Sequence, residues 1–329
     1  MKLVRYKQRY AANMFEKLMS LKALSGARVW LRDHNALSSK RDWYTFLKKI
    51  TDVLTDNDLT ERAASVAYNL ILAIFPTIIF LFTLIPYIPS VNENVIMGFF
   101  ARVLPGGTFD TVGPTLKDII SRPRGGVLSV GFLLALYSAT SGMGALMNAF
   151  NSSHEVPEQR TFLYKKGVAV GLTVALALSL FLAITLLVVG GVVIEYLARF
   201  GVFNNAVIYF ALKVARYLLV FGVFVGVVSV MYRYGPDVNM KWTFVTPGSV
   251  TASVLIVLTT LAFSYYVSNF GSYNKLYGSI GTLIALMIWT NLVSLLLIFG
   301  FEVNVNLFDL EGEKNPSVTA KTTNATSNK

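Results

Sequence analysis

Six long stretches of this chain contain no charged residue, and they constrain its fold more than any other feature. They cover residues 63–92, 125–153, 167–194, 217–232, 242–274 and 276–301. All but the fourth exceed the roughly 20 residues that a helix needs to cross the hydrocarbon core of a membrane. The fourth reaches this length if its helix begins near Ala206 and includes Lys213 and Arg216. The chain is therefore predicted to be an all-α polytopic membrane protein with six transmembrane helices.

The composition supports this prediction. Only 14% of the residues are charged and 54% are hydrophobic, whereas soluble domains contain roughly 25% charged residues. The expected helices cover about residues 63–90, 126–153, 167–195, 206–232, 243–270 and 276–303. They form a transmembrane domain of residues 59–310, which lies between a basic N-terminal region of residues 1–58 and a disordered tail of residues 311–329.

The distribution of Lys and Arg predicts the orientation of the helices. Residues 1–62 contain thirteen of the 29 basic residues, and the loops on the same side of the membrane are richer in them than the loops opposite. By the positive-inside rule, both termini face the cytoplasm, and we expect a multi-pass protein of the bacterial inner membrane. The net charge of +11 is then a topology signal. No nucleic-acid-binding module is recognisable, so we expect no nucleic-acid partner.

Two amphipathic stretches occur in the predicted cytoplasmic N-terminal region, at residues 14–31 and 43–54. In both, Leu and aromatic residues recur at helical spacing between Lys and Arg residues. Basic helices of this kind lie on anionic lipid surfaces. Packing against the cytoplasmic ends of the bundle is the alternative, and the sequence leaves both open.

Polar and small residues inside the predicted helices are candidate sites, because hydrocarbon does not satisfy their hydrogen bonds. In the second helix, Ser138, Gly142 and Gly144 form small-residue faces that favour close helix packing, and Asn148 continues this polar stripe. The further candidates are Tyr68, Asn69 and Asn291. For the three asparagines and Tyr68, contact with a substrate and packing between helices are both open.

Lys213 and Arg216 are three residues apart and share one face of the fourth helix. One interpretation is that both side chains extend to the outer headgroups. The other is that they point into a cavity and attract an anionic lipid or solute, with Glu195 at the end of the third helix as an ionic partner.

The stretch NFGSYNKLYGSIG, residues 269–281, interrupts the apolar sequence between the last two helices. Gly278 and Gly281 allow close approach of the backbone. Tyr273 and Tyr277 belong to an aromatic belt at the membrane interface and are candidates for a substrate path. We expect the stretch to turn the chain at the membrane surface and to dip into a cavity of the bundle.

Catalytic patterns are missing from the sequence. It contains no cysteine and only two histidines, His34 and His154, without metal-ligand spacing. None of the common nucleophile, zinc or nucleotide-binding motifs occurs. We therefore expect no enzymatic activity, no metal and no cofactor.

Four ordered blocks give the chain a family resemblance. They are TERAASVAYNLILAIFP at residues 60–76, LYSATSGMGALMNAFNSSHEVPEQRTFLYKKG at 136–167, MYRYGPDVNMKWTFVTPG at 231–248, and the segment 266–304 with its closing Gly-x-Glu. With them, the chain resembles the YihY/BrkB family of bacterial inner-membrane proteins over about residues 45–308. The resemblance implies six helices, no agreed activity, and links to envelope integrity, virulence and lipid handling. The family was formerly labelled as ribonucleases. Hydrolysis of RNA usually needs clustered carboxylates and histidines that hold metal ions, and this sequence lacks such a cluster.

These features lead to one functional hypothesis and two alternatives. We expect the protein to transport or handle an envelope lipid or small solute, with membrane lipids, including an anionic lipid, as its partners. A membrane scaffold for envelope integrity is the first alternative, and an intramembrane hydrolase is the second. The oligomeric state is left open.

Overall fold

The computed structural model describes residues 25–36, 42–55, 57–87, 96–98, 113–114, 117–118, 123–153, 158–199, 206–238, 243–269 and 279–308. Within these ranges the chain is helical apart from short connections and one isolated β-bridge, between Asn35 and Asp42. The predicted all-α class is confirmed for the described residues.

Six of the described helices are long and apolar enough to cross a membrane, which confirms the predicted number. They are α4 (Asn57–Leu84), α7 (Gly125–Ser153), α8 (Phe162–Arg199), α9 (Ala206–Tyr234), α10 (Pro247–Asn269) and α12 (Ser279–Phe308). Helix α4 contains Pro76 within its length. It is followed directly by the short 3-10 turn η2 (Ile85–Tyr87), which contains Pro86. Helix α8 begins before its uncharged run, because the long side chains of Lys165 and Lys166 can extend from a helix end towards water.

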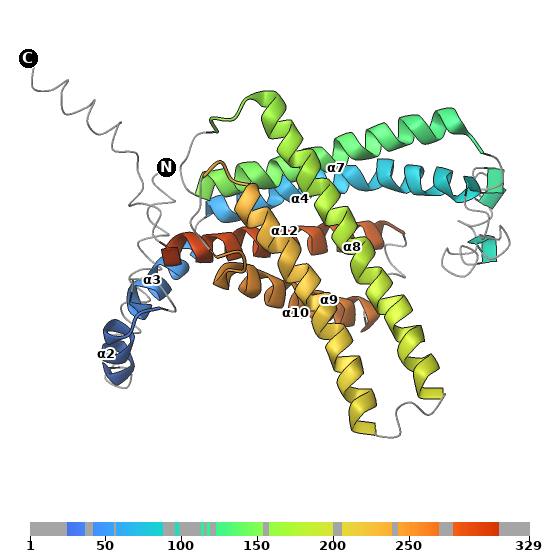
Figure 1. Ribbon diagram of the computed structural model, residues 1–329. Helices are drawn as coiled ribbons and strands as arrows, with labels where there is room; N and C mark the ends of the chain where they lie inside the picture. Colours follow the sequence, from blue (N-terminus) through green and yellow to red (C-terminus); the bar gives the residue numbers. More distant parts are fainter. Residues whose placement is uncertain are drawn as a thin grey trace, which may run out of the picture.

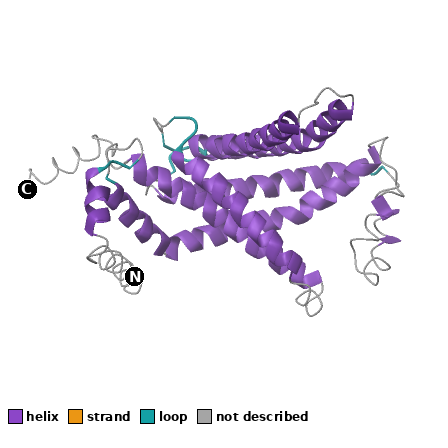
Figure 2. Ribbon diagram, turned by 90° about the horizontal axis from the view of Figure 1, so that it is seen from below, coloured by secondary structure: helices purple, strands orange, loops and turns teal. Residues whose placement is uncertain are grey.

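The six helices form three antiparallel pairs, α4 with α7, α8 with α9, and α10 with α12. The pairs converge at one end and diverge towards the other, as Figures 1 and 2 show. We call the end at which α4, α8 and α10 begin and α7, α9 and α12 finish the packed end. Further contacts join α4 to α12, α7 to α8 and α9 to α10.

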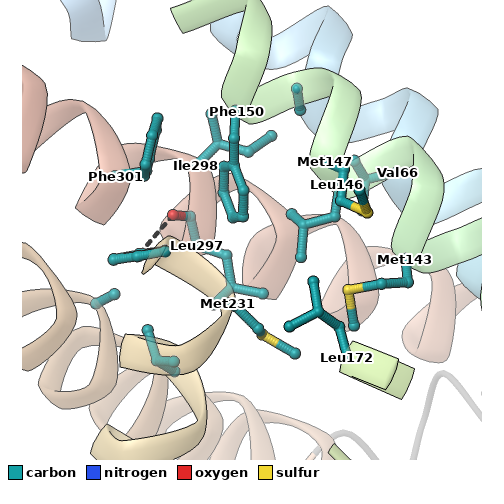
Figure 3. Close-up of a cluster of buried hydrophobic side chains, with 14 of the residues drawn as sticks. Val66, Met143, Leu146, Met147, Phe150, Leu172, Met231, Leu297, Ile298 and Phe301 are labelled. Atoms are coloured by element: carbon teal, nitrogen blue, oxygen red, sulfur yellow. Dashed lines mark hydrogen bonds between the residues drawn. The ribbon is translucent and has the colours of Figure 1, made fainter. Parts of the chain in front are cut away.

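The hydrophobic core lies at the packed end (Figure 3). Phe150 and Phe301 pack with ring centroids 4.6 Å apart, and Tyr232 donates a hydrogen bond of 2.6 Å to the Leu297 carbonyl oxygen. Towards the other end, large apolar side chains such as Leu133 are exposed. An exposed apolar surface of this extent is stable in hydrocarbon and costly in water.

Two glycines allow α10 and α12 to approach closely at the packed end. A Cβ atom on Gly248 would collide with the Gly300 carbonyl oxygen, and a Cβ atom on Gly300 would lie 2.5 Å from the Cβ atom of Ala252. Because the helices are so close, Oδ1 of Asn304 in α12 accepts a 2.7 Å hydrogen bond from the Gly248 N–H in α10. Its Nδ2 donates at 2.8 Å to Thr246, which caps the start of α10.

A buried ion pair joins three helices at the same end. Nη2 of Arg62 in α4 lies 3.0 Å from Oε1 of Glu302 in α12, and both side chains are largely buried. Nη1 of Arg62 also donates to the Ala149 carbonyl oxygen and the Ser153 hydroxyl of α7. Asp58 forms a second ion pair with the same guanidinium at 2.9 Å. The acceptors in α7 and α12 therefore tie α4 to its two neighbours, and Asp58 holds the guanidinium from within α4.

The N-terminal region supplies two further helices, α2 (Ser25–Asp33) and α3 (Trp43–Thr55). Helix α3 packs against the last turns of α12, where Phe46 joins Val303 and Leu307 in a small buried cluster. Of the two alternatives for the amphipathic stretch at residues 43–54, the structure therefore shows packing against the bundle. Helix α2 leaves Trp30 about half exposed, so a role of α2 on a lipid surface stays a prediction.

We expect Gly300→Ala to destabilise the bundle, because the new methyl group would meet Ala252 and the Tyr232 hydroxyl. Overpacking of this kind costs about 1–3 kcal/mol. Thermal unfolding of the detergent-solubilised protein measures the effect. Gly226→Ala in α9 is the control, since its Cβ atom would contact nothing within 4 Å. Equal melting temperatures for the two variants would contradict the close contact.

Arg62→Met is expected to destabilise the protein more strongly, because it leaves the Glu302 carboxylate buried without its partner. Breaking a buried ion pair in this way costs about 3–5 kcal/mol. The double variant Arg62→Met/Glu302→Gln should recover part of the loss. The single variant Glu302→Gln completes the comparison. If the loss of unfolding free energy in the double variant equalled the sum of the losses in the two single variants, the pair would not be coupled.

Candidate functional site

A cavity of about 530 Å³ lies at the packed end between α4, α7 and the start of α8. Its lining residues are Arg62, Ser65, Asn69, Ser141, Gly144, Ala145, Asn148, Ala149, Ser152, Phe162, Lys165, Lys166 and Ala169. The deepest of them, Asn69 and Ser141, lie about three turns from the helix ends, roughly 16–18 Å along the helix axes at 1.5 Å per residue. The cavity therefore extends from the packed end about three helical turns into the bundle.

Small residues of α7 make room for the cavity. Ser141, Gly144, Ala145 and Asn148 recur at helical spacing on one face of the helix. A Cβ atom on Gly144 would meet nothing within 4 Å. Gly142, by contrast, faces α4, where a Cβ atom would lie 2.7 Å from a methyl carbon of Leu70. The small-residue stretch thus serves packing on one face and the cavity on another.

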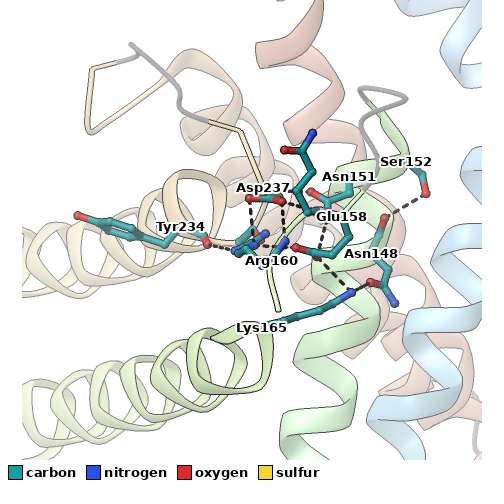
Figure 4. A network of polar contacts seen from close by, with 10 residues as sticks. Asn148, Asn151, Ser152, Glu158, Arg160, Lys165, Tyr234 and Asp237 are labelled. Atoms are coloured by element: carbon teal, nitrogen blue, oxygen red, sulfur yellow. Dashed lines mark hydrogen bonds and ion pairs between the residues drawn. The ribbon is translucent and has the colours of Figure 1, made fainter. Parts of the chain in front are cut away.

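Asn148 and Lys165 meet at the rim of the cavity (Figure 4). Nζ of Lys165 donates a 2.7 Å hydrogen bond to Oδ1 of Asn148 and lies 3.1 Å from Oε2 of Glu158. Oε2 of Glu158 also accepts a 3.0 Å hydrogen bond from Asn151. Helices α7 and α8 are therefore joined through polar side chains at the cavity's edge.

The loop between α7 and α8 is fixed to the loop that follows α9. Arg160 forms ion pairs with Glu158 at 2.8 Å and Asp237 at 3.3 Å, and it donates at 2.8 Å to the Gly235 carbonyl oxygen. Asp237 in turn accepts a hydrogen bond from the Gln159 N–H at 2.7 Å. These contacts hold the start of α8, and with it the cavity wall, in a defined position.

The pKa of Glu158 reflects this network. Burial by itself raises the pKa of the carboxyl group, but the hydrogen bonds from Arg160 and Lys165 outweigh it, so the pKa lies below its ordinary value. Glu158 therefore stays ionised at neutral pH and keeps its attraction for Lys165.

Arg62 and Lys166 complete the basic part of the lining. Arg62 reaches the cavity while its guanidinium holds Glu302 and Asp58. Lys166 is half-buried, and its Nζ lies 5.7 Å from the Tyr137 ring centroid and 5.9 Å from that of Phe162. Cation–π contacts at these distances are weak.

The structure brings some of the predicted site residues together. Asn69 and Asn148 line the same cavity, with Gly144 between them on its wall. Asn69 donates its own amide to the Ser65 carbonyl oxygen at 2.9 Å. Tyr68 points away from the bundle and is 64% exposed, and neither Ser138 nor Asn291 is among the described lining residues.

Other predicted residues lie far from the cavity. Arg216 packs against Gly190 and Gly191 of α8 and reaches the Leu187 carbonyl oxygen at 3.4 Å, while Lys213 lies over the Tyr209 ring. Glu195 is exposed, and no ion pair within the described ranges joins it to either cation. Gly281 is buried in the first turn of α12. Tyr273, Tyr277 and Gly278 lie outside the described residues.

Sequence reasoning did not identify Arg62, Lys165 and Lys166 as cavity residues. All three were counted only as positive charges that orient the helices. A signal was present, since both lysines fall within the second of the four ordered blocks and Arg62 opens the first. Among the described residues, no three His, Asp or Glu side chains gather closely enough to hold a metal ion.

Comparison with known proteins extends these observations. The profile of the family described as virulence factor BrkB matches residues 50–322. The chain is 31% identical over 269 residues to a Bacillus subtilis protein named as ribonuclease-like, YfkH, a match that covers 80% of this chain and 95% of that one. It is 23% identical to a UPF0761 membrane protein of Aggregatibacter aphrophilus, over 83% of this chain and 95% of the relative.

A UPF0761 membrane protein of Mannheimia succiniciproducens is 22% identical over 77% of this chain and 86% of its own length. No solved structure is significantly similar to the chain. The family match covers all six long helices and agrees with the resemblance carried by the four sequence blocks. The chain belongs to the BrkB family of multi-pass membrane proteins.

Proposed function

We propose that the protein moves, or helps to move, a lipid or small solute across the bacterial inner membrane, and that the cavity between α4, α7 and α8 is part of the path. The observation that carries this proposal is the depth of the cavity. Its polar lining continues from the basic residues at the packed end to Asn69 and Ser141, about three turns inside the helix ends. Transport proteins commonly bind their substrates within the span of their helices.

Further support comes from the cost of polar groups in hydrocarbon. The amides and hydroxyls that line the cavity would be unfavourable against lipid tails. Water in this space of about 530 Å³ would hydrate them, and the space is large enough for a headgroup or a small solute. The helix pairs diverge (Figure 2) and expose many apolar side chains, which is consistent with access from the membrane.

A scaffold without transport is the second candidate. It is favoured by the dense aromatic and aliphatic core at the packed end and by the position of Asn291, which is not among the described cavity residues.

We also propose that the protein is not an enzyme. Incubation of the purified protein with envelope lipids and with RNA tests it, and turnover of either would contradict it.

We expect Gly144→Phe to block the path, because the new side chain would enter open space in the cavity without displacing a neighbour of its Cβ atom. Molecules that copurify with the wild type are first identified by mass spectrometry and then offered to proteoliposomes. Gly144→Phe should lower both the bound amount and the transport rate about tenfold or more, which corresponds to roughly 1.4 kcal/mol.

Gly171→Phe in α8 is the matched control for this experiment. Its Cβ atom would also meet nothing within 4 Å, but Gly171 is exposed and does not line the cavity. It should behave like the wild type. Equal transport by both variants would exclude the cavity as the path, and a wild type that transports none of its copurified molecules would favour the scaffold.

A further inference from the structure

The charges around the cavity are unequally distributed. Its described lining contains three cations, Arg62, Lys165 and Lys166, and no carboxylate. Glu302 and Asp58 engage Arg62, and Glu158 engages Lys165. These acids therefore lie beside the cavity and not in its lining.

Lys166 differs from the other two cations. Within the described ranges it has no carboxylate partner, and its ammonium group contacts only the Tyr137 and Phe162 rings. The group is half-buried between α7 and α8. A cation in partly desolvated surroundings favours an anion nearby, because the Coulomb energy of a pair increases as the effective dielectric constant falls.

Asn148 provides donors in the same cavity lining. The side chain of lysine can only donate hydrogen bonds, so the contact with Lys165 identifies the accepting atom of Asn148 as Oδ1. The Nδ2 group must then point the other way, as Figure 4 shows. No partner for Nδ2 occurs among the described residues, and the Asn148 side chain is exposed to the cavity. Two N–H donors are thus available to a ligand.

The surroundings of Lys166 indicate where such a ligand would come from. Phe162 and Tyr137, which flank its ammonium group, are 72% and 68% exposed. Lys166 lies four residues after the start of α8, roughly 6 Å along the helix axis. Exposed aromatic residues are typical of the zone in which lipid headgroups meet the hydrocarbon.

From these observations we infer that the cavity binds a phosphate ester, with Nζ of Lys166 as the principal ligand of the phosphate and Nδ2 of Asn148 as a donor elsewhere in the same lining. Lysine binds phosphate as a point charge, and the amide donates to other oxygens of the ester. Arg62 and Lys165 add positive potential while they remain paired with their own acids. The inference rests on the proposed function only in taking the same cavity as the site.

The phosphate could belong to a membrane lipid or to a soluble ester, and the chemistry of the site is common to both. The exposed aromatic side chains on either side of Lys166 favour the lipid. Its acyl chains could then lie along the outside of α7 and α8 while the phosphate occupies the cavity.

Native mass spectrometry of the detergent-purified full-length protein tests the site with defined probes. The probes are dioleoylphosphatidylglycerol, dioleoylglycerol, which has the same chains without phosphate, and glycerol 3-phosphate. We expect the phosphatidylglycerol to bind and the dioleoylglycerol not to bind. Lys166→Gln should weaken binding about tenfold, the effect of one charge-assisted hydrogen bond.

Asn148→Asp is the second variant. It keeps an oxygen acceptor for Lys165 but replaces the free N–H donors by a negative oxygen, so it should also weaken binding of the phosphate ester while preserving the fold. Lys213→Gln is the matched control, because Lys213 is likewise half-buried in a transmembrane helix but lies outside the cavity. It should bind like the wild type.

The possible results separate the proposals. Competition by glycerol 3-phosphate that depends on Lys166 would support a soluble phosphate ester as the ligand, and its absence a lipid. Unchanged binding in both Lys166→Gln and Asn148→Asp, or an equal loss in Lys213→Gln, would overturn the inference. If binding needed Lys166 but the protein transported nothing in proteoliposomes, the phosphate-ester site would be supported and the transport function would be rejected.

Discussion

The buried ion pair between Arg62 and Glu302 is the interaction on which the arrangement of this protein most depends. It joins α4 to α12 at 3.0 Å, and the same guanidinium holds the end of α7 through Ala149 and Ser153. Apolar helices in lipid gain little from hydrophobic burial against one another, so such polar contacts determine which helices meet. Because Arg62 also lines the cavity, the contact that sets the fold also forms part of the site.

Close packing and openness are divided along the length of the helices. At the packed end, Gly248 and Gly300 let α10 and α12 touch, and an aromatic core fills the space between the pairs. At the other end the pairs diverge (Figure 1), and many of their apolar side chains are exposed. The cavity lies between α4, α7 and the start of α8, where the small side chains of α7 leave space and the Lys165–Asn148 hydrogen bond joins α7 to α8.

Much of this architecture could be predicted from sequence because a membrane imposes a simple requirement on each helix. The uncharged runs gave the correct number of spans, and the cost of polar groups in hydrocarbon pointed to Asn69 and Asn148. Contacts between distant segments could not be predicted, and Arg62 and Glu302 are 240 residues apart. Lys166 was overlooked because a basic residue at a helix end fits the positive-inside rule and needs no second explanation.

The central claim is that a water-accessible cavity enters the bundle from the packed end. The chain contains no cysteine, so single cysteines can be placed at Ser141 and at Leu133, one in the cavity lining and one on the lipid-facing side of the same helix. Their reaction with a charged, membrane-impermeant maleimide is measured in vesicles of both orientations. We predict that Ser141→Cys reacts from the packed end only and that Leu133→Cys does not react. An unreactive Ser141→Cys, or equal reaction of both, would contradict the account.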